Sequence, residues 1–143
     1  MNSKFELLLD DTVESFGIKL FRIRALISFD NVKAGDVGGY IEKEENLSES
    51  GNAWVYGNAR VYGNAEVSGD ARVTSKKDYI VFKNSWSSFR WFTYTKSNKM
   101  WNVGCFSGTG QELIEKAYKD NEKSGKSYEA YVNLVLELEK LDD

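Results

Sequence analysis

The sequence contains no histidine, and this absence removes much of the usual enzyme chemistry. Imidazole is the most common general base and metal ligand in proteins. With one thiol in the chain, a zinc site would have to take most of its ligands from carboxylates, which zinc sites rarely do. The acidic runs at residues 42–45 and 137–143 are typical of a solvated surface and a helix end, and they offer no acid and base pair. We therefore expect no catalytic residue, no metal and no cofactor.

Cysteine is nearly absent as well. The single thiol, Cys105, allows no internal disulfide and fits a reducing compartment. It lies in a strand-like stretch, so we interpret it as a small buried hydrophobic residue. The alternative, a nucleophile, would need a base other than histidine to activate the thiol.

Long apolar runs and an excess of positive charge are also missing. Glu6 interrupts the apolar stretch of residues 5–9, and we expect neither a secretory segment nor a membrane span. The formal net charge of −3 provides no basic field that would hold nucleic acid or an anionic membrane non-specifically. Of the 143 residues, 41% are hydrophobic and 14% aromatic, which is enough for the core of one domain or two small ones. We expect a cytoplasmic protein.

What the sequence does contain is a repeat. Four hexads follow one another over residues 51–74, each with Gly first, Asn or Asp second, Ala third and Val fifth. Ala and Val two residues apart point to the same side of a short strand, and the Gly-Asn or Gly-Asp pair bends the chain between strands. A flexible linker would not keep Ala and Val in phase. The repeat predicts a short hexapeptide-repeat β-solenoid, a parallel β-helix with roughly eighteen residues per coil.

The phase of the repeat extends upstream. Leu47 and Ile41 occupy the position of the hexad alanines, whereas the companion positions Glu49 and Lys43 are polar. We expect residues 41–50 to form an irregular first coil or a cap. At most two coils are then present, too few to be stable alone, so the flanking segments must cover the ends.

The flanking segments carry strand and helix patterns. In the first 40 residues we expect strands over 4–9, ended by Asp10 and Asp11, and over 18–26, with Phe21, Ile23 and Ala25 facing the core. Arg22 and Arg24 fall on the opposite face, where solvation explains them better than an anion site.

The last 68 residues predict a different arrangement. Aromatic and β-branched stretches at 79–82, 89–95 and 100–106 indicate a three-stranded antiparallel meander. Thr109 and Glu112 form a capping-box signature for one helix, and Gly125 separates it from a second helix that begins near Ser127. The predicted division is a β element at 1–40, the solenoid at 41–75 and an α+β segment at 76–143, mainly β as a whole.

Several stretches carry a resemblance to a known group of proteins: residues 20–26 (LFRIRAL), 35–48 (GDVGGYIEKEENLS), 51–55 (GNAWV) and 103–109 (VGCFSGT). The chain resembles uncharacterised phage and prophage proteins that are labelled hexapeptide-repeat proteins or transferases. The absence of histidine favours a non-enzymatic binding protein. The resemblance implies that it interferes with a host process, such as a bacterial defence system, by binding a host protein or a small nucleotide in the host cytoplasm. The alternatives are an acyl or nucleotide-sugar transferase, whose relatives use a histidine base that is absent here, and a structural assembly module.

A set of outward-facing aromatic and basic residues in the hexads is the first candidate for binding. We expect these side chains to contact another subunit in a homo-oligomer, a dimer or trimer held mainly by Trp54 and Tyr56. The C-terminal segment is the alternative cover. The set consists of Trp54, Tyr56, Arg60, Tyr62 and Arg72.

The start of the first predicted helix is the second candidate. Ser107, Gly108 and Thr109 lead into it, and free backbone amides at a helix N-terminus can hold a phosphate or carboxylate. No Gly-Lys-Ser/Thr follows and the glycine spacing is not GxGxxG, so neither nucleotide-binding motif is present. Helix capping is the interpretation that we favour over an anion site.

Overall fold

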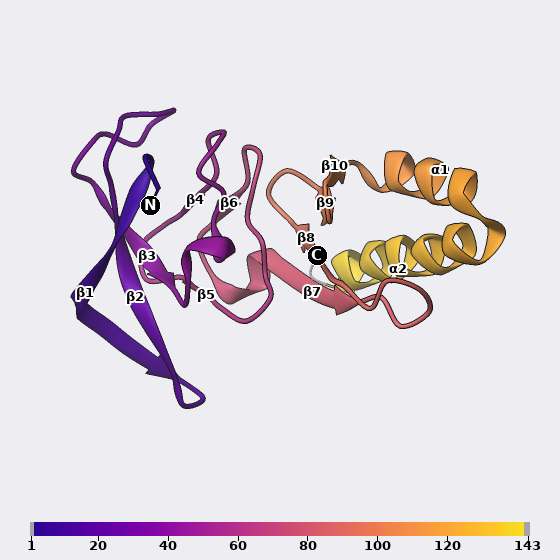
Figure 1. The fold of residues 1–143 in the computed structure, drawn as a ribbon, viewed down its shortest axis with the longest axis horizontal. Coiled ribbons are helices and arrows are strands. Elements are labelled where there is room, and N and C mark those ends of the chain that lie inside the picture. The colour runs from indigo at the N-terminus through magenta and orange to yellow at the C-terminus, as the bar shows by residue number, and fades with distance from the viewer. Residues whose placement is uncertain (1, 142–143) are drawn as a thin grey trace.

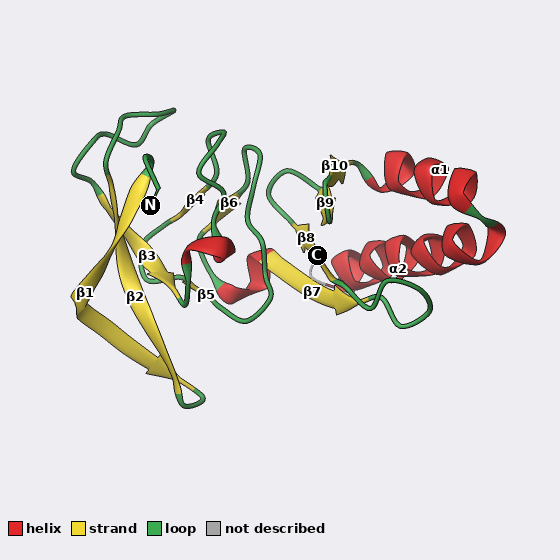
Figure 2. Ribbon diagram, viewed as in Figure 1, coloured by secondary structure: helices red, strands yellow, loops and turns green. Residues whose placement is uncertain are grey.

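Residues 2–141 are described by a computed structural model, which has strands first and two helices at the end (Figure 1). Figure 2 shows how short most strands are and how much of the chain between them is loop and turn. The strands are β1 (Phe5–Ser15), β2 (Ile18–Ala25), β3 (Val37–Ile41), β4 (Trp54–Val55), β5 (Arg60–Val61), β6 (Arg72–Val73), β7 (Tyr79–Lys83), β8 (Trp91–Thr95), β9 (Met100–Val103) and β10 (Phe106–Gly108); the helices are α1 (Gly110–Asp120) and α2 (Glu122–Leu141), and η1 (Glu44–Asn46) and η2 (Lys76–Asp78) are single 3-10 turns.

The first sheet begins with a long hairpin. Its strand order is β1-β2-β3-β5, with β1, β2 and β3 antiparallel. The prediction that the first strand ends at Asp10 and Asp11 is wrong, because β1 resumes pairing at Thr12 after a register shift and continues to Ser15. Such a bulge bends the strand and increases its twist. The second half of the hairpin therefore projects beyond the rest of the sheet (Figure 1).

The hexads place their alanines and valines as the sequence predicts. Two pairs of short strands are parallel: Tyr40 of β3 lies opposite Arg60 of β5, and Trp54 of β4 opposite Arg72 of β6. The alanine and valine side chains form one hydrophobic cluster with the N-terminal strands. Its hexad members, all at most 5% exposed, are Ala53, Val55, Ala59, Val61, Ala65, Val67, Ala71 and Val73.

The predicted β-solenoid is nevertheless wrong. The short strands belong to two open sheets that neither close nor coil, and no parallel β-helix is formed within residues 2–141. β5 ends the sheet that the antiparallel strands begin, and β4 pairs with β6 alone. The physical reason is that β2 occupies the other edge of β3 in antiparallel pairing, so this sheet grows sideways into a hairpin. The fold is mainly β, with mixed sheets and two helices.

Trp54 is buried, so its predicted outward exposure is also wrong. Its side chain is 1% exposed and makes edge-to-face contacts with the rings of Phe5 and Phe29. The N-terminal segment supplies the cover, in place of a second subunit or the C-terminal segment. Gly38 permits this close packing, because a Cβ there would lie 2.8 Å from the Trp54 ring and 2.6 Å from the Val55 carbonyl oxygen.

A second sheet and the two helices form a separate hydrophobic cluster. The sheet has four antiparallel strands in the order β10-β9-β8-β7, one more than predicted, because the chain turns at Gly104 and Cys105 and pairs again. This turn leaves Cys105 exposed, so the prediction that it is buried is wrong. The cluster includes Phe92, Tyr94, Trp101, Leu113, Ala117, Tyr128, Val132 and Val135.

The helix boundaries differ from the prediction at one point. The Thr109–Glu112 capping box is present at the start of α1. The second helix begins at Glu122, not near Ser127, because the break falls at Asn121, whose side-chain oxygen accepts a hydrogen bond from the Ser124 amide at 2.8 Å. Gly125 lies inside α2, where a Cβ would lie 2.3 Å from the Tyr118 ring. This glycine permits the close packing of the helices and does not end one.

Polar contacts join the hexads to the second sheet. The Glu66 amide donates to Thr93 Oγ1 at 3.0 Å, and Ser68 Oγ donates to Asn102 Oδ1 at 2.6 Å. The helices cover the other face of the sheet, with Phe92, Tyr94 and Trp101 between them.

None of the helices in the described part of the chain has the length and apolar character needed to cross a membrane. The predicted boundaries near residues 40 and 75 stay a prediction, and residues 1, 142 and 143 of the outer segments lie outside the described residues.

Replacing Ala65 with Leu tests the inward face of the hexads. Ala65 is 1% exposed, and extra methyl groups there should lower the free energy of unfolding by about 1 to 3 kcal/mol through overpacking. Replacing the exposed neighbour Glu66 with Ala should change the free energy by less than about 0.5 kcal/mol. Urea unfolding of both variants checks this, and equal losses would contradict the inward placement of the alanines.

Lys4 should make stability depend on pH in the alkaline range. Its side chain is 1% exposed and its ammonium donates to the carbonyl oxygens of Ser48 at 3.0 Å and Ala53 at 2.6 Å. Burial lowers the pKa of Lys4 from 10.5 to about 8. Because the unfolded chain holds this proton more tightly, the charge destabilises the folded state below pH 8, and the cost is relieved as pH rises toward 10.5.

The measurement is the free energy of unfolding at several pH values between about 7 and 10, for the wild type and Lys4→Met. The wild type should gain stability relative to the variant as pH rises. Exposed Lys19 provides the control, because Lys19→Met should follow the wild type. A constant difference between wild type and Lys4→Met would contradict the lowered pKa.

Candidate functional site

The tip of the β1–β2 hairpin presents an aromatic ring to solvent. The connection is a two-residue turn, Phe16–Gly17, with φ of 54° and 80°, as a type I′ turn requires. Phe16 is 87% exposed, the largest value among the large hydrophobic side chains that the structure describes. The tip of the hairpin projects beyond the rest of the first sheet (Figure 2).

Phe16 is also in a conformation that disfavours it. Positive φ is uncommon for residues other than Gly, Asn and Asp, and for a bulky side chain it is a genuine outlier. An Asn at this place would satisfy the turn with less strain and would remove an exposed apolar surface. Phe16 therefore combines a strained backbone with an exposed apolar side chain. Backbone strain of this kind is typical of functional sites.

The hexads and η2 supply the surroundings of the hairpin tip. The Lys76 ammonium lies 5.4 Å from the centroid of the Phe16 ring and 5.8 Å from that of the Tyr62 ring, within the range of cation–π attraction. Arg60 Nη1 donates to Ser15 Oγ at 2.8 Å and so ties the hairpin to the hexads. We call the residues Phe16, Arg60, Tyr62 and Lys76 the hairpin surface.

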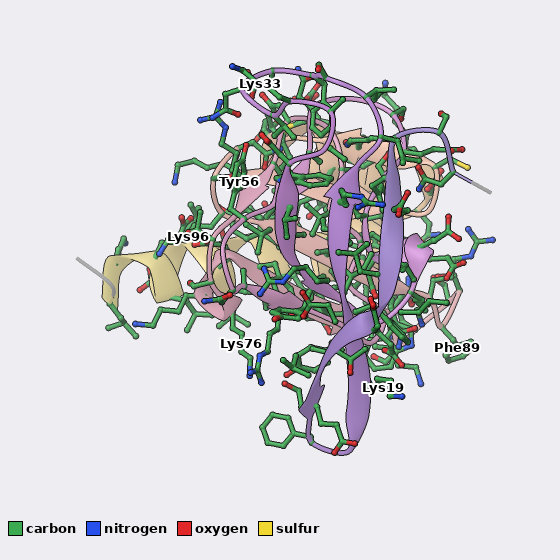
Figure 3. The ribbon with its side chains drawn as sticks, turned by 90° about the vertical axis from the view of Figure 1, so that its left-hand side faces the viewer. Lys19, Lys33, Tyr56, Lys76, Phe89 and Lys96 are labelled. Atoms are coloured by element: carbon green, nitrogen blue, oxygen red, sulfur yellow. The ribbon has the colours of Figure 1, made fainter. Side chains whose placement is uncertain are left out.

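The four residues of the hairpin surface carry two positive charges and no negative one, although the chain carries a net charge of −3. Exposed Glu14 lies nearby on the hairpin, and the charge of Lys19 opposite it offsets its own. Arg60 and Lys76 both contribute positive charge. Asp78, two residues from Lys76, is engaged elsewhere, since its carboxylate accepts hydrogen bonds from the amides of Thr74 at 2.7 Å and Ser75 at 3.1 Å. Figure 3 shows Lys76 and Lys19 on either side of the projecting hairpin. An apolar ring beside positive charge suits a partner with an apolar pocket and acidic surroundings.

The structure separates the five predicted hexad residues. Arg60 and Tyr62 join the hairpin surface, whereas Trp54 is buried. Tyr56 and Arg72 lie against the loop at residues 30 and 31. The Tyr56 hydroxyl donates to Asn31 Oδ1 at 3.0 Å, and Arg72 forms an ion pair with Asp30 at 2.8 Å. Figure 3 shows Tyr56 well apart from Lys76. A binding role for these residues stays a prediction, but Trp54 no longer offers a surface for a second subunit.

The predicted anion site lies at a helix start that is already capped. Ser107 is exposed, Gly108 is buried, and the Thr109 amide donates to Glu112 Oε1 at 2.9 Å. Hydrogen bonds from the Thr109 amide and side chain lower the pKa of the Glu112 carboxyl. The capping interpretation is confirmed, and the carboxylate of Glu112 takes an amide that an anion would need.

Two members of the hairpin surface, Phe16 and Lys76, were not predicted from the sequence. One signal for Phe16 was available: an aromatic residue precedes Gly17 between two strand-like stretches, where Asn-Gly is the usual pair. No comparable signal marks Lys76, since its contact with Phe16 depends on the bend of the hairpin toward η2.

Comparisons with known proteins add no family to these observations. No model of a protein family matches the chain, and no curated protein matches it in sequence. The resemblance to phage hexapeptide-repeat proteins stays a prediction.

Proposed function

We propose that this is a non-enzymatic binding protein that recognises a partner protein through the hairpin surface, with Phe16 entering an apolar pocket of the partner. The observation that carries the proposal is Phe16 itself, 87% exposed at a φ of 54°. An exposed aromatic side chain on a rigid support loses little conformational entropy on binding, and aromatic residues dominate the energetics of interfaces.

The support for the ring is well defined. β1 and β2 pair without a break from Thr12↔Phe21 to Ser15↔Ile18, and Arg60 binds the hairpin at Ser15. Lys76 and Arg60 beside the ring would steer an acidic partner toward it, and salt should weaken this attraction.

The biological setting rests on the resemblance to phage proteins. We propose that the partner is a bacterial host protein in the cytoplasm, for example a component of a defence system. Four other roles compete with this one: self-association into a homo-oligomer, binding of a small nucleotide, a transferase activity and a structural role in assembly.

Replacing Phe16 with Asn should stabilise the protein and abolish binding. Asn tolerates positive φ, so the free energy of unfolding should rise by about 1 kcal/mol. The same change removes the ring, so a tagged Phe16→Asn protein should no longer retain the partner that the wild type captures from a bacterial lysate. Urea unfolding and quantitative mass spectrometry of the captured proteins give the two results.

Phe89 supplies a matched control. It is also exposed, at 63%, and has a φ of 60°, but it lies in the loop between β7 and β8. Phe89→Asn should relieve similar strain and leave capture unchanged. A partner that Phe16→Asn still captures, or that is lost equally with both variants, would contradict the proposal.

A further inference from the structure

A cleft separates the loop of residues 84–90 from the β9–β10 turn and the two helices. Its volume is about 580 Å³, within the range of sites for small molecules. An adjoining hole of about 80 Å³ has a lining that includes the apolar side chains of Val103, Phe106, Leu113 and Ala117. The cleft lies in the helical part of the molecule, whereas the hairpin surface lies among the N-terminal strands and the hexads.

Two cations line the cleft without a protein partner. Arg90 comes from the loop before β8 and Lys116 from α1, and neither side chain forms a hydrogen bond or ion pair with any residue in the range 2–141. The Arg90 guanidinium lies against the backbone of the β9–β10 turn, where a Cβ on Gly104 would be 3.0 Å from Nη1. Asp120 is the single acidic residue of the described lining, so the cleft carries an excess of positive charge.

Two hydroxyl groups in the lining, both on α2, have protons to donate. The first is the Tyr128 hydroxyl, which accepts a hydrogen bond from Asn84 Nδ2 at 3.3 Å. The orientation of the Asn84 amide is defined because its Oδ1 accepts hydrogen bonds from the amides of Trp86 at 3.0 Å and Ser87 at 2.9 Å. The indole of Trp86 likewise donates to Ser124 Oγ at 3.1 Å. Each hydroxyl therefore accepts one hydrogen bond, and neither donates its proton to any of residues 2–141.

The wall that carries Arg90 is firmly held. The Asn84 amide donates to the Arg90 carbonyl oxygen at 2.8 Å, which closes the loop at its base, and the Asn84 side chain is 2% exposed. Phe89 has a φ of 60°, a strained conformation that persists only where the surroundings enforce it. The loop backbone that carries Arg90 is thus held in place before any ligand binds.

We propose that this cleft binds a small organic anion, whose phosphate or carboxylate is held by Arg90, Lys116 and the hydroxyls of Ser124 and Tyr128, and whose apolar part enters the adjoining hole. All four groups donate hydrogen bonds, so they require an acceptor-rich group. A guanidinium accommodates either anion in a bidentate manner. This inference does not depend on the hairpin surface.

Four probes separate the parts of the proposal in titrations followed by amide chemical shifts: phenyl phosphate, benzoate, benzyl alcohol and inorganic phosphate. Phenyl phosphate or benzoate should bind with a dissociation constant on the order of millimolar, as expected for so small a ligand. Shifts should concentrate in the amides of residues 104–107 and 116–120. Comparison of these two probes shows which anion is preferred. Benzyl alcohol and inorganic phosphate should each bind about tenfold more weakly than the better of the two.

Matched variants identify the groups responsible. Lys116→Gln and Tyr128→Phe should each weaken binding of the preferred anionic probe about tenfold, which is the loss of one charge-assisted or hydroxyl hydrogen bond. Lys119→Gln on the same helix, Tyr131→Phe on α2 and Phe16→Asn should bind as the wild type does. Three outcomes would overturn the proposal: no saturable shift, equal binding of inorganic phosphate and the aromatic anions, or equal binding by Tyr128→Phe and Tyr131→Phe.

Discussion

The packing of the N-terminal segment over Trp54 is the contact on which the strand-rich part of the molecule depends. Phe5 and Phe29 contact the indole edge-to-face, and the buried Lys4 ammonium donates to carbonyl oxygens of the hexad region. Strands of only two residues bury little apolar surface by themselves. By covering their outer side, the N-terminal segment converts a thin layer of strands into a core with two buried faces.

This anchoring also explains how the hairpin can present Phe16. The base of β1 and β2 belongs to the core, since Phe5, Ile23 and Ala25 are all at most 2% exposed. Beyond the bulge, the paired strands and the Arg60 contact keep the tip in place. A strained turn persists only where its surroundings over-determine it, and here the strain is held next to the side chain that we propose to bind.

The hairpin surface and the cleft use different physical means of recognition. The first offers an exposed ring with nearby positive charge, which suits a folded partner that supplies the pocket. The second supplies the pocket itself, with oriented hydrogen-bond donors and an apolar hole. The two lie in parts of the molecule that have separate hydrophobic clusters, one around the hexads and one between the second sheet and the helices.

The sequence alone determined what depends on neighbours in the chain. The inward phase of hexad residues such as Ala65 and Val67, a strand predicted over residues 18–26 and the capping box at Thr109 all follow from local periodicity or spacing. The structure has each of them, with the strand ending one residue earlier, at Ala25. Of the hairpin surface, Arg60 and Tyr62 were predicted because the repeat turns them away from the core.

Only the tertiary structure decided which surfaces are covered. The phase of the hexads predicts an outward Trp54 side chain, yet a segment about fifty residues earlier buries it within the same hydrophobic cluster. The open sheets arise because β2 pairs with β3, and the period of the hexads contains no information about that partner. Phe16 meets Lys76 because a bulge bends the hairpin toward η2. A repeat specifies the direction of a side chain relative to its own strand, whereas its exposure depends on distant segments that compete to cover the same apolar surface.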